Sequence, residues 1–61
     1  MKFLGITQSD ISDGATTNPI VINSNNIVAT NGNVVLCNSK EFVWVDGAWE
    51  ELGSESSFKL V

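Results

Sequence analysis

The chain contains no histidine, and Cys37 is its only cysteine. Zinc sites need several soft ligands and a Cys–His nucleophilic pair needs both residues, so counting excludes these chemistries and an intrachain disulfide. Arginine is absent too, and three lysines stand against seven carboxylates, which gives a net charge of -4. The basic footprint required by nucleic acid or an anionic membrane is missing. We therefore expect no enzymatic activity, no cofactor, no metal, and no nucleic-acid or membrane partner.

Long apolar runs are also missing. No stretch approaches the roughly 18 apolar residues of a membrane-spanning helix. The segment from Met1 to Gln8 has one lysine but too few consecutive apolar residues for the core of a signal peptide. We expect a soluble protein that is made in the cytoplasm.

With 61 residues, the chain has room for one small domain but not for two domains or an enclosed cofactor cleft. Natural domains of this size often add disulfides, a metal or subunit contacts to a small core. Since the composition excludes the first two, self-association or docking on a larger body is the favoured supplement. The alternative is a small monomer stabilised by burial of its two tryptophans and by well-matched turns.

Turn-forming residues divide the sequence into short segments rich in Val, Ile, Phe or Trp. No window shows the apolar period of an ordinary helix without an interrupting Gly, Pro or Asn. The pattern predicts an all-β domain, a small antiparallel β-meander that is sandwich-like or barrel-like, with about five to six short strands. The expected strands are Phe3–Thr7, Ile20–Asn23, Ile27–Thr30, Val34–Cys37, Glu41–Val45 and Ala48–Leu52.

Two dipeptides, Asn31-Gly32 and Asp46-Gly47, carry the strongest hairpin signals. A type I′ turn needs positive φ at both central residues, which these pairs tolerate. The last four strands are therefore expected to form an antiparallel meander. A two-residue loop at Asp46-Gly47 also fixes the register and puts Trp44 opposite Trp49.

Both faces of this second hairpin are expected to be apolar. The register predicts that three aromatic residues share one face, where they anchor the core or a subunit contact, and that aliphatic residues share the other. The candidate binding or interface residues are Phe42, Trp44 and Trp49 on the first face, and Val43, Val45 and Leu52 on the second.

A sheet that is apolar on both sides requires a cover on each. One alternative is that the N-terminal residues Phe3, Leu4 and Ile6 fold over the hairpin, and the other is that a second copy of the chain covers it.

Aromatic pairs such as Trp44 and Trp49 also serve as stacking platforms for sugars, although a packing role is favoured for cross-strand tryptophans.

The remaining polar segments carry weaker signals. The stretch Gln8–Pro19 is interpreted as a loop with a turn anchored by the side chain of Asp10 or Asp13. Residues 10–14 resemble the start of a calcium loop, but the twelfth position, where an acid is required, is Val21. Cys37 is interpreted as a small packing residue.

Glu50 and Glu51 are adjacent, so they point to opposite sides of a strand and cannot form a glycosidase acid–base pair. We divide the chain into a β-meander module over residues 1–53 and a C-terminal linker or edge strand over residues 54–61.

Two separated stretches resemble a known module. Residues 13–22, DGATTNPIVI, and residues 33–53, NVVLCNSKEFVWVDGAWEELG, are similar to segments of a short module in virion structural proteins of phages and prophages. Its pattern has Asp where this chain has Asn33 and an aromatic residue where it has Cys37. The resemblance implies a non-enzymatic, oligomeric component of a head fibre, tail fibre or similar appendage, made in the bacterial host cytoplasm and located in the virion.

The sequence therefore favours a structural module that associates as a trimer or as repeated copies, with itself or with other virion proteins. A carbohydrate-binding module that stacks sugars on Trp44 and Trp49 is the alternative. A small acidic protein that mimics nucleic acid is a third hypothesis, against which the single, scattered carboxylates argue.

Overall fold

The computed structural model describes residues 1–54, and in this range it contains six strands and no helix. The predicted all-β class is confirmed, and each expected strand overlaps an observed one. The final strand extends to Ser54, and the rest of the predicted C-terminal linker or edge strand lies outside the described residues. The strands are β1 (Lys2–Ile6), β2 (Ile20–Ile22), β3 (Asn25–Ile27), β4 (Asn33–Cys37), β5 (Lys40–Val45) and β6 (Ala48–Ser54).

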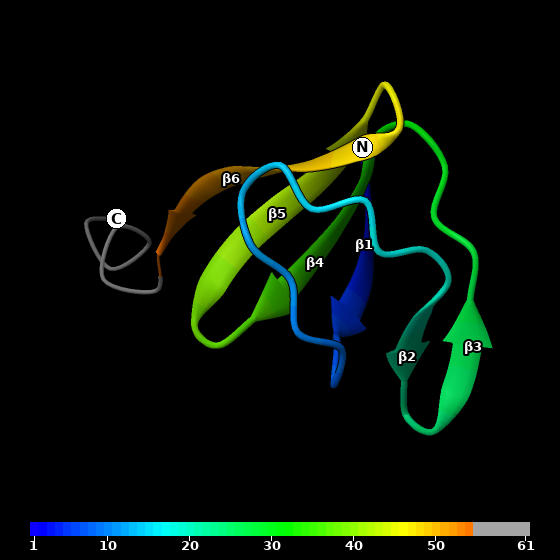
Figure 1. Ribbon diagram of the computed structural model, residues 1–61. Coiled ribbons are helices and arrows are strands. Elements are labelled where there is room, and N and C mark those ends of the chain that lie inside the picture. The colour runs from blue at the N-terminus through cyan, green and yellow to red at the C-terminus, as the bar shows by residue number, and fades with distance from the viewer. Residues whose placement is uncertain (55–61) are drawn as a thin grey trace.

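The strands form one four-stranded sheet and a separate hairpin of β2 and β3. The sheet has the order β1-β4-β5-β6, in which β1 is parallel to β4 and the other neighbours are antiparallel. Figure 1 shows the segment between β1 and β2 passing in front of the sheet. We call the face toward this segment the inner face, and the opposite one the outer face.

Three two-residue turns of the type I′ form connect neighbouring strands. Asn23-Ser24 joins β2 to β3 with φ of 52° and 66°, and Asn38-Ser39 joins β4 to β5 with φ of 51° and 66°. Asp46-Gly47 joins β5 to β6 with φ of 52° and 82°. Positive φ at both central residues matches the twist of the flanking strands, so each turn closes a tight hairpin.

The predicted register of the β5–β6 hairpin is confirmed. Trp44 lies opposite Trp49, and Val43 lies opposite Glu50. The ladder shifts by one residue farther from the turn, where Leu52 is the extra residue of a bulge.

The prediction of a hairpin at Asn31-Gly32 is wrong. The strand before it, β3, pairs with β2, and the chain then turns to enter the sheet as β4. Gly32 has a φ of 90° but Asn31 is not in the left-handed region, whereas a type I′ turn requires both. The Gly32 N–H donates to Trp44 O at 2.9 Å, so this turn is tied to β5 instead. The meander has three strands, β4 to β6, rather than four.

The alternative in which Phe3, Leu4 and Ile6 fold over the hairpin is also wrong. These residues form β1, which lies in the sheet beside β4, with Phe3 paired to Val34 and Ile6 to Leu36. A shift between these pairs makes Leu4 an extra residue, and its side chain packs against the core. The inner face is covered instead by the β1–β2 connection and the β2–β3 hairpin.

In this covering layer, side chains of the β1–β2 connection form hydrogen bonds with backbone groups that would otherwise pair with another strand. Thr7 Oγ1 donates to Val21 O at 2.9 Å, and the Val21 N–H donates to Ser9 Oγ at 3.0 Å. The Asn18 amide accepts from Ala29 N–H at 2.9 Å and donates to Ala29 O at 3.1 Å, where the β2–β3 ladder would place its next pair. Short polar side chains therefore attach a segment without regular structure to its neighbours.

Candidate functional site

The candidate residues of the β5–β6 hairpin divide between the two faces of the sheet. The aromatic residues Phe42, Trp44 and Trp49 belong to the inner face and are 1%, 9% and 0% exposed. They form one core cluster with residues of the covering layer and of β4. The other buried members of the cluster are Ile11, Ile20, Ile22, Ala29, Val35 and Cys37.

The two tryptophans pack against each other edge to face. Their ring centroids are 5.1 Å apart and the ring planes cross at 67°. The indole N–H of Trp49 donates to Thr17 O at 2.8 Å, so the polar atom of this fully buried ring has a partner. A stacking platform for sugars requires exposed rings in one plane, whereas these rings are buried and crossed. Their geometry is that of a core pair.

Sequence reasoning missed the core residue that the connection supplies. Ile11 is 5% exposed, although it stands alone among polar residues in a segment interpreted as a loop. The signal for a buried position was that Ile11 is an isolated apolar residue in a long polar connection. A long loop that lies on a sheet is held there by burying such a side chain. The interpretation of Cys37 as a packing residue is confirmed, since it is 2% exposed and its thiol lies 3.3 Å from Ser9 O.

The carboxylate of Asp13 has a structural role. The predicted loop contains a turn in which the Ala15 N–H donates to Ser12 O at 2.9 Å, and Asp13 Oδ1 accepts from the N–H of Glu51 on β6 at 3.0 Å. The anchor therefore reaches a distant strand rather than the turn itself. Within residues 1–54, no group of three or more His, Cys, Asp or Glu side chains is placed to hold a metal ion.

The two adjacent glutamates of β6 lie on opposite faces, as predicted. Glu50 pairs with Val43 of the outer face, and Glu51 pairs with Phe42 of the inner face. Both are exposed. They do not converge on a common point.

Val43 and Val45 belong to the outer face by strand pairing, and Leu52, the extra residue of the bulge in β6, lies at its margin. Val43 is 6% exposed, Val45 is half-buried and Leu52 is 48% exposed. None of the three belongs to the core cluster. Strand pairing places further apolar residues, from β1 and β4, on the same face of the sheet as Val43. We define the outer apolar face as Phe3, Ile6, Val34, Leu36, Val43, Val45 and Leu52.

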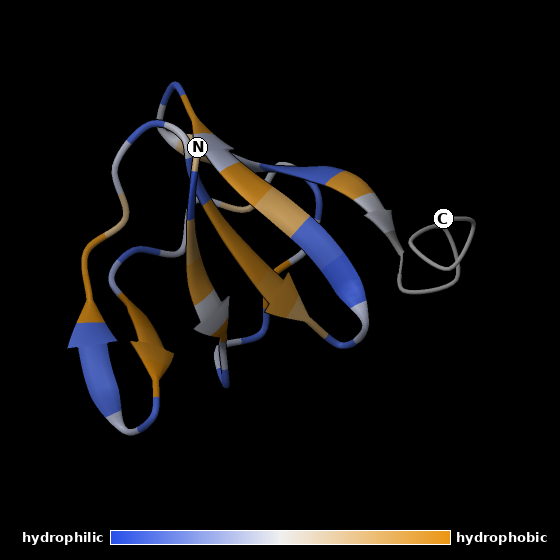
Figure 2. Cartoon of the chain, turned by 180° about the vertical axis from the view of Figure 1, so that it is seen from behind, coloured by the Kyte–Doolittle hydropathy of each residue, from blue (hydrophilic) through white to orange (hydrophobic). Residues whose placement is uncertain are grey.

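The outer apolar face is dense at its centre and exposed at its margins. Val34 and Val43 lie opposite each other on the two middle strands and are 4% and 6% exposed. Phe3 and Ile6 on β1 are 57% and 62% exposed. Figure 2, which views the molecule from behind, shows hydrophobic colour along the middle strands, and no described segment crosses in front of them. This face can bury apolar surface of a partner.

A scan against protein-family models finds no match for this chain, and comparisons with curated proteins and with solved structures find none either. Among the described residues, no helix is long and apolar enough to cross a membrane. The outer apolar face is therefore the candidate site, and it is defined by the structure alone.

Proposed function

We propose that this chain is a non-enzymatic structural module of a phage virion, of the fibre, spike or decoration type, which associates with its own copies or docks on a larger particle. The observation that carries the proposal is the outer apolar face, whose exposed margin residues Phe3, Ile6 and Leu52 have no cover within residues 1–54. The resemblance of residues 13–22 and 33–53 to virion modules supports the same function.

The size of the face indicates how such a module would be used. Fully burying a large aliphatic or aromatic side chain contributes about 1.5–3 kcal/mol, so covering the exposed half of each margin residue contributes roughly 1 kcal/mol. Three such residues give about 3 kcal/mol, to which the other residues of the contact add, whereas association costs about 4–15 kcal/mol in lost freedom of motion. One contact of this kind is weak, but repeated copies on one particle act together through a high effective concentration. The modest size of this face therefore suits a module that is present in many copies on one particle.

The carbohydrate-binding alternative has less support. It relied on Trp44 and Trp49 as a sugar platform, and these rings fill the core instead. A sugar site on this chain would need other residues.

The proposal is tested by the mass and the thermal midpoint of the purified chain over concentrations from about 10 μM to about 1 mM. Stability that comes from association rises with concentration by mass action, whereas that of a monomer does not. We expect the average mass to exceed that of one chain at the upper end, with a rising midpoint. A single-chain mass and a constant midpoint over this range would refute self-association.

A matched pair of variants tests whether the outer apolar face is responsible. Leu52→Lys places a charge on the face at a residue that is 48% exposed, and Val28→Lys places the same charge at a residue that is 68% exposed and lies between β3 and β4. We expect Leu52→Lys to weaken docking of the chain through this face, and Val28→Lys to leave it unchanged. Equal effects of the two variants would contradict a role for this face.

A further inference from the structure

The two edges of the four-stranded sheet, β1 and β6, differ in how many of their backbone groups form hydrogen bonds with other parts of the chain. The β1–β2 connection pairs with the edge of β6, where the Trp49 N–H donates to Ala15 O at 2.8 Å and the Gly14 N–H donates to Trp49 O at 2.7 Å. Asp13 Oδ1 accepts from Glu51 N–H on the same edge at 3.0 Å. These bonds give the edge of β6 partners within the chain, as natural sheets do to prevent unwanted pairing.

The edge of β1 has much less cover. The N–H groups of Lys2 and Thr7 donate toward β4, at 3.0 Å and 2.9 Å. Backbone groups alternate in direction along the strand on each side of the bulge at Leu4, so those of Phe3, next to Lys2, and of Ile6, next to Thr7, point away from the sheet. Within the described residues, the hydrogen bond recorded on this side of the strand is from Gln8 Nε2 to Ile6 O, at 3.3 Å. A carbonyl oxygen accepts two hydrogen bonds, so Ile6 O keeps a second site.

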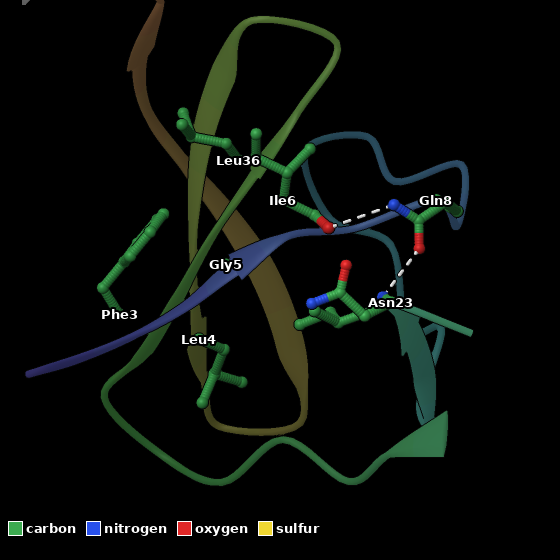
Figure 3. Close-up of a pocket in the computed structure, with 8 residues that line it drawn as sticks. Phe3, Leu4, Gly5, Ile6, Gln8, Asn23 and Leu36 are labelled. Carbon is green, nitrogen blue, oxygen red and sulfur yellow. Dashed lines mark hydrogen bonds between the residues drawn. The ribbon is translucent and has the colours of Figure 1, made fainter. Parts of the chain in front are cut away.

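A groove of about 550 Å³ runs along this edge. Figure 3 shows Phe3, Ile6 and Leu36 on one side of β1 and Leu4 on the other. The lining contains no carboxylate, although the whole chain has a net charge of -4. The lining residues are Phe3, Leu4, Gly5, Ile6, Gln8, Ile22, Asn23 and Leu36.

The two ends of β1 have complementary chemistry. Lys2 stands at the N-terminal end of β1, and the side chains of Gln8 and Asn23 lie at the C-terminal end. An interface about a two-fold axis brings each end of a patch against the opposite end of its copy. An antiparallel second copy therefore brings its lysine to the amide oxygens, and a parallel one would place two Lys2 side chains together, which is unfavourable.

We propose that β1 pairs edge to edge with β1 of a second copy, antiparallel and about a two-fold axis, with Phe3 opposite Ile6 of the second copy. This inference rests on the proposed self-association and names its contact. The pair joins two four-stranded sheets into one of eight strands, and the two outer apolar faces become one wide surface that meets the particle.

Cysteine cross-linking tests this register. In a hydrogen-bonded antiparallel pair, opposite Cα atoms are about 5.5 Å apart, within the range of a disulfide. The variants Phe3→Cys and Ile6→Cys are mixed, one of them isotope-labelled, oxidised gently and identified by mass after digestion. We expect the mixed 3–6 disulfide to exceed the 3–3 and 6–6 disulfides by at least about tenfold. Val28→Cys, exposed and outside the sheet, measures random oxidation.

The alternatives give different products. Predominant 3–3 disulfide means parallel pairing, and disulfides at the level of Val28→Cys mean random collision, and either result overturns the inference. If the wild type associates without a mixed disulfide and Leu52→Lys abolishes association, the contact lies near β6, so the inference fails and the proposed function stands. A single-chain mass for the wild type overturns the inference together with the self-association on which it rests.

A charge substitution gives an independent readout. Ile6→Lys puts a charge beside Phe3 of the second copy, at a residue that is 62% exposed in the single chain. We expect its self-association to weaken by at least about tenfold relative to Val28→Lys. Unchanged tryptophan emission, from the buried Trp44 and Trp49, shows that the fold is kept. Association as strong as that of the Val28→Lys control would overturn the inference.

Discussion

Replacing Trp49 is the most direct test of how this small sheet is stabilised. Its ring is 0% exposed, packs on Trp44 and donates to Thr17 O. Truncating a buried tryptophan to alanine costs about 3–5 kcal/mol. A chain of 61 residues has a total stability of roughly 3–9 kcal/mol at typical values per residue. We therefore expect Trp49→Ala to lose a large part of this stability and to unfold at a much lower urea concentration than the wild type.

A graded variant separates packing from the hydrogen bond. Trp49→Phe keeps an aromatic ring but loses the indole N–H and part of the ring volume, at an expected cost of about 1–3 kcal/mol. Urea denaturation followed by circular dichroism measures both variants. Val28→Ala serves as the control, since Val28 is 68% exposed and substitution there is expected to change the stability by less than about 0.5 kcal/mol. A wild-type midpoint for Trp49→Ala would refute the burial of this ring.

Three further predictions concern the covering layer and the turns. Asn18→Ala removes both hydrogen bonds to Ala29 and is expected to lower the unfolding free energy by about 1–3 kcal/mol in urea, and an unchanged midpoint would contradict the pairing role of this amide. Ser39→Gly is expected to raise the stability by up to about 1 kcal/mol, because Ser39 has a φ of 66° that glycine adopts without strain, and a loss of stability would contradict this. The thiol of Cys37, 2% exposed, is expected to react with a thiol reagent only after denaturation, and fast reaction of the native chain would show that the core opens readily.

The parts of the fold that the sequence predicts are those set by local turns. Asp46-Gly47 fixes the pairing of Trp44 with Trp49, because a two-residue turn leaves one register. The division of Phe42 and Val43 between two faces follows from the same register and from the alternation of side chains along a strand.

The parts that it does not predict depend on contacts between distant residues. Asn31-Gly32 carries the same local signal as Asp46-Gly47. The strand before it, β3, nevertheless pairs with β2, because the turn at Asn23-Ser24 joins these two strands directly. The parallel pairing of β1 with β4 has no local signal, because about two dozen residues separate these strands and no turn joins them directly. The open edge of β1 is a consequence of that pairing, so the sequence alone did not reveal it.

The polar attachment of the β1–β2 connection has a consequence for how this chain tolerates change. Thr7, Ser9 and Asn18 each form a hydrogen bond with a specific backbone group, so their hydroxyl and amide groups hold the connection in place. A segment whose composition suggests a replaceable spacer is then among the least replaceable parts of the molecule. Shortening it or enriching it in glycine and serine would expose the indole pair to water, whereas the exposed strand margins accept new side chains without loss of the fold.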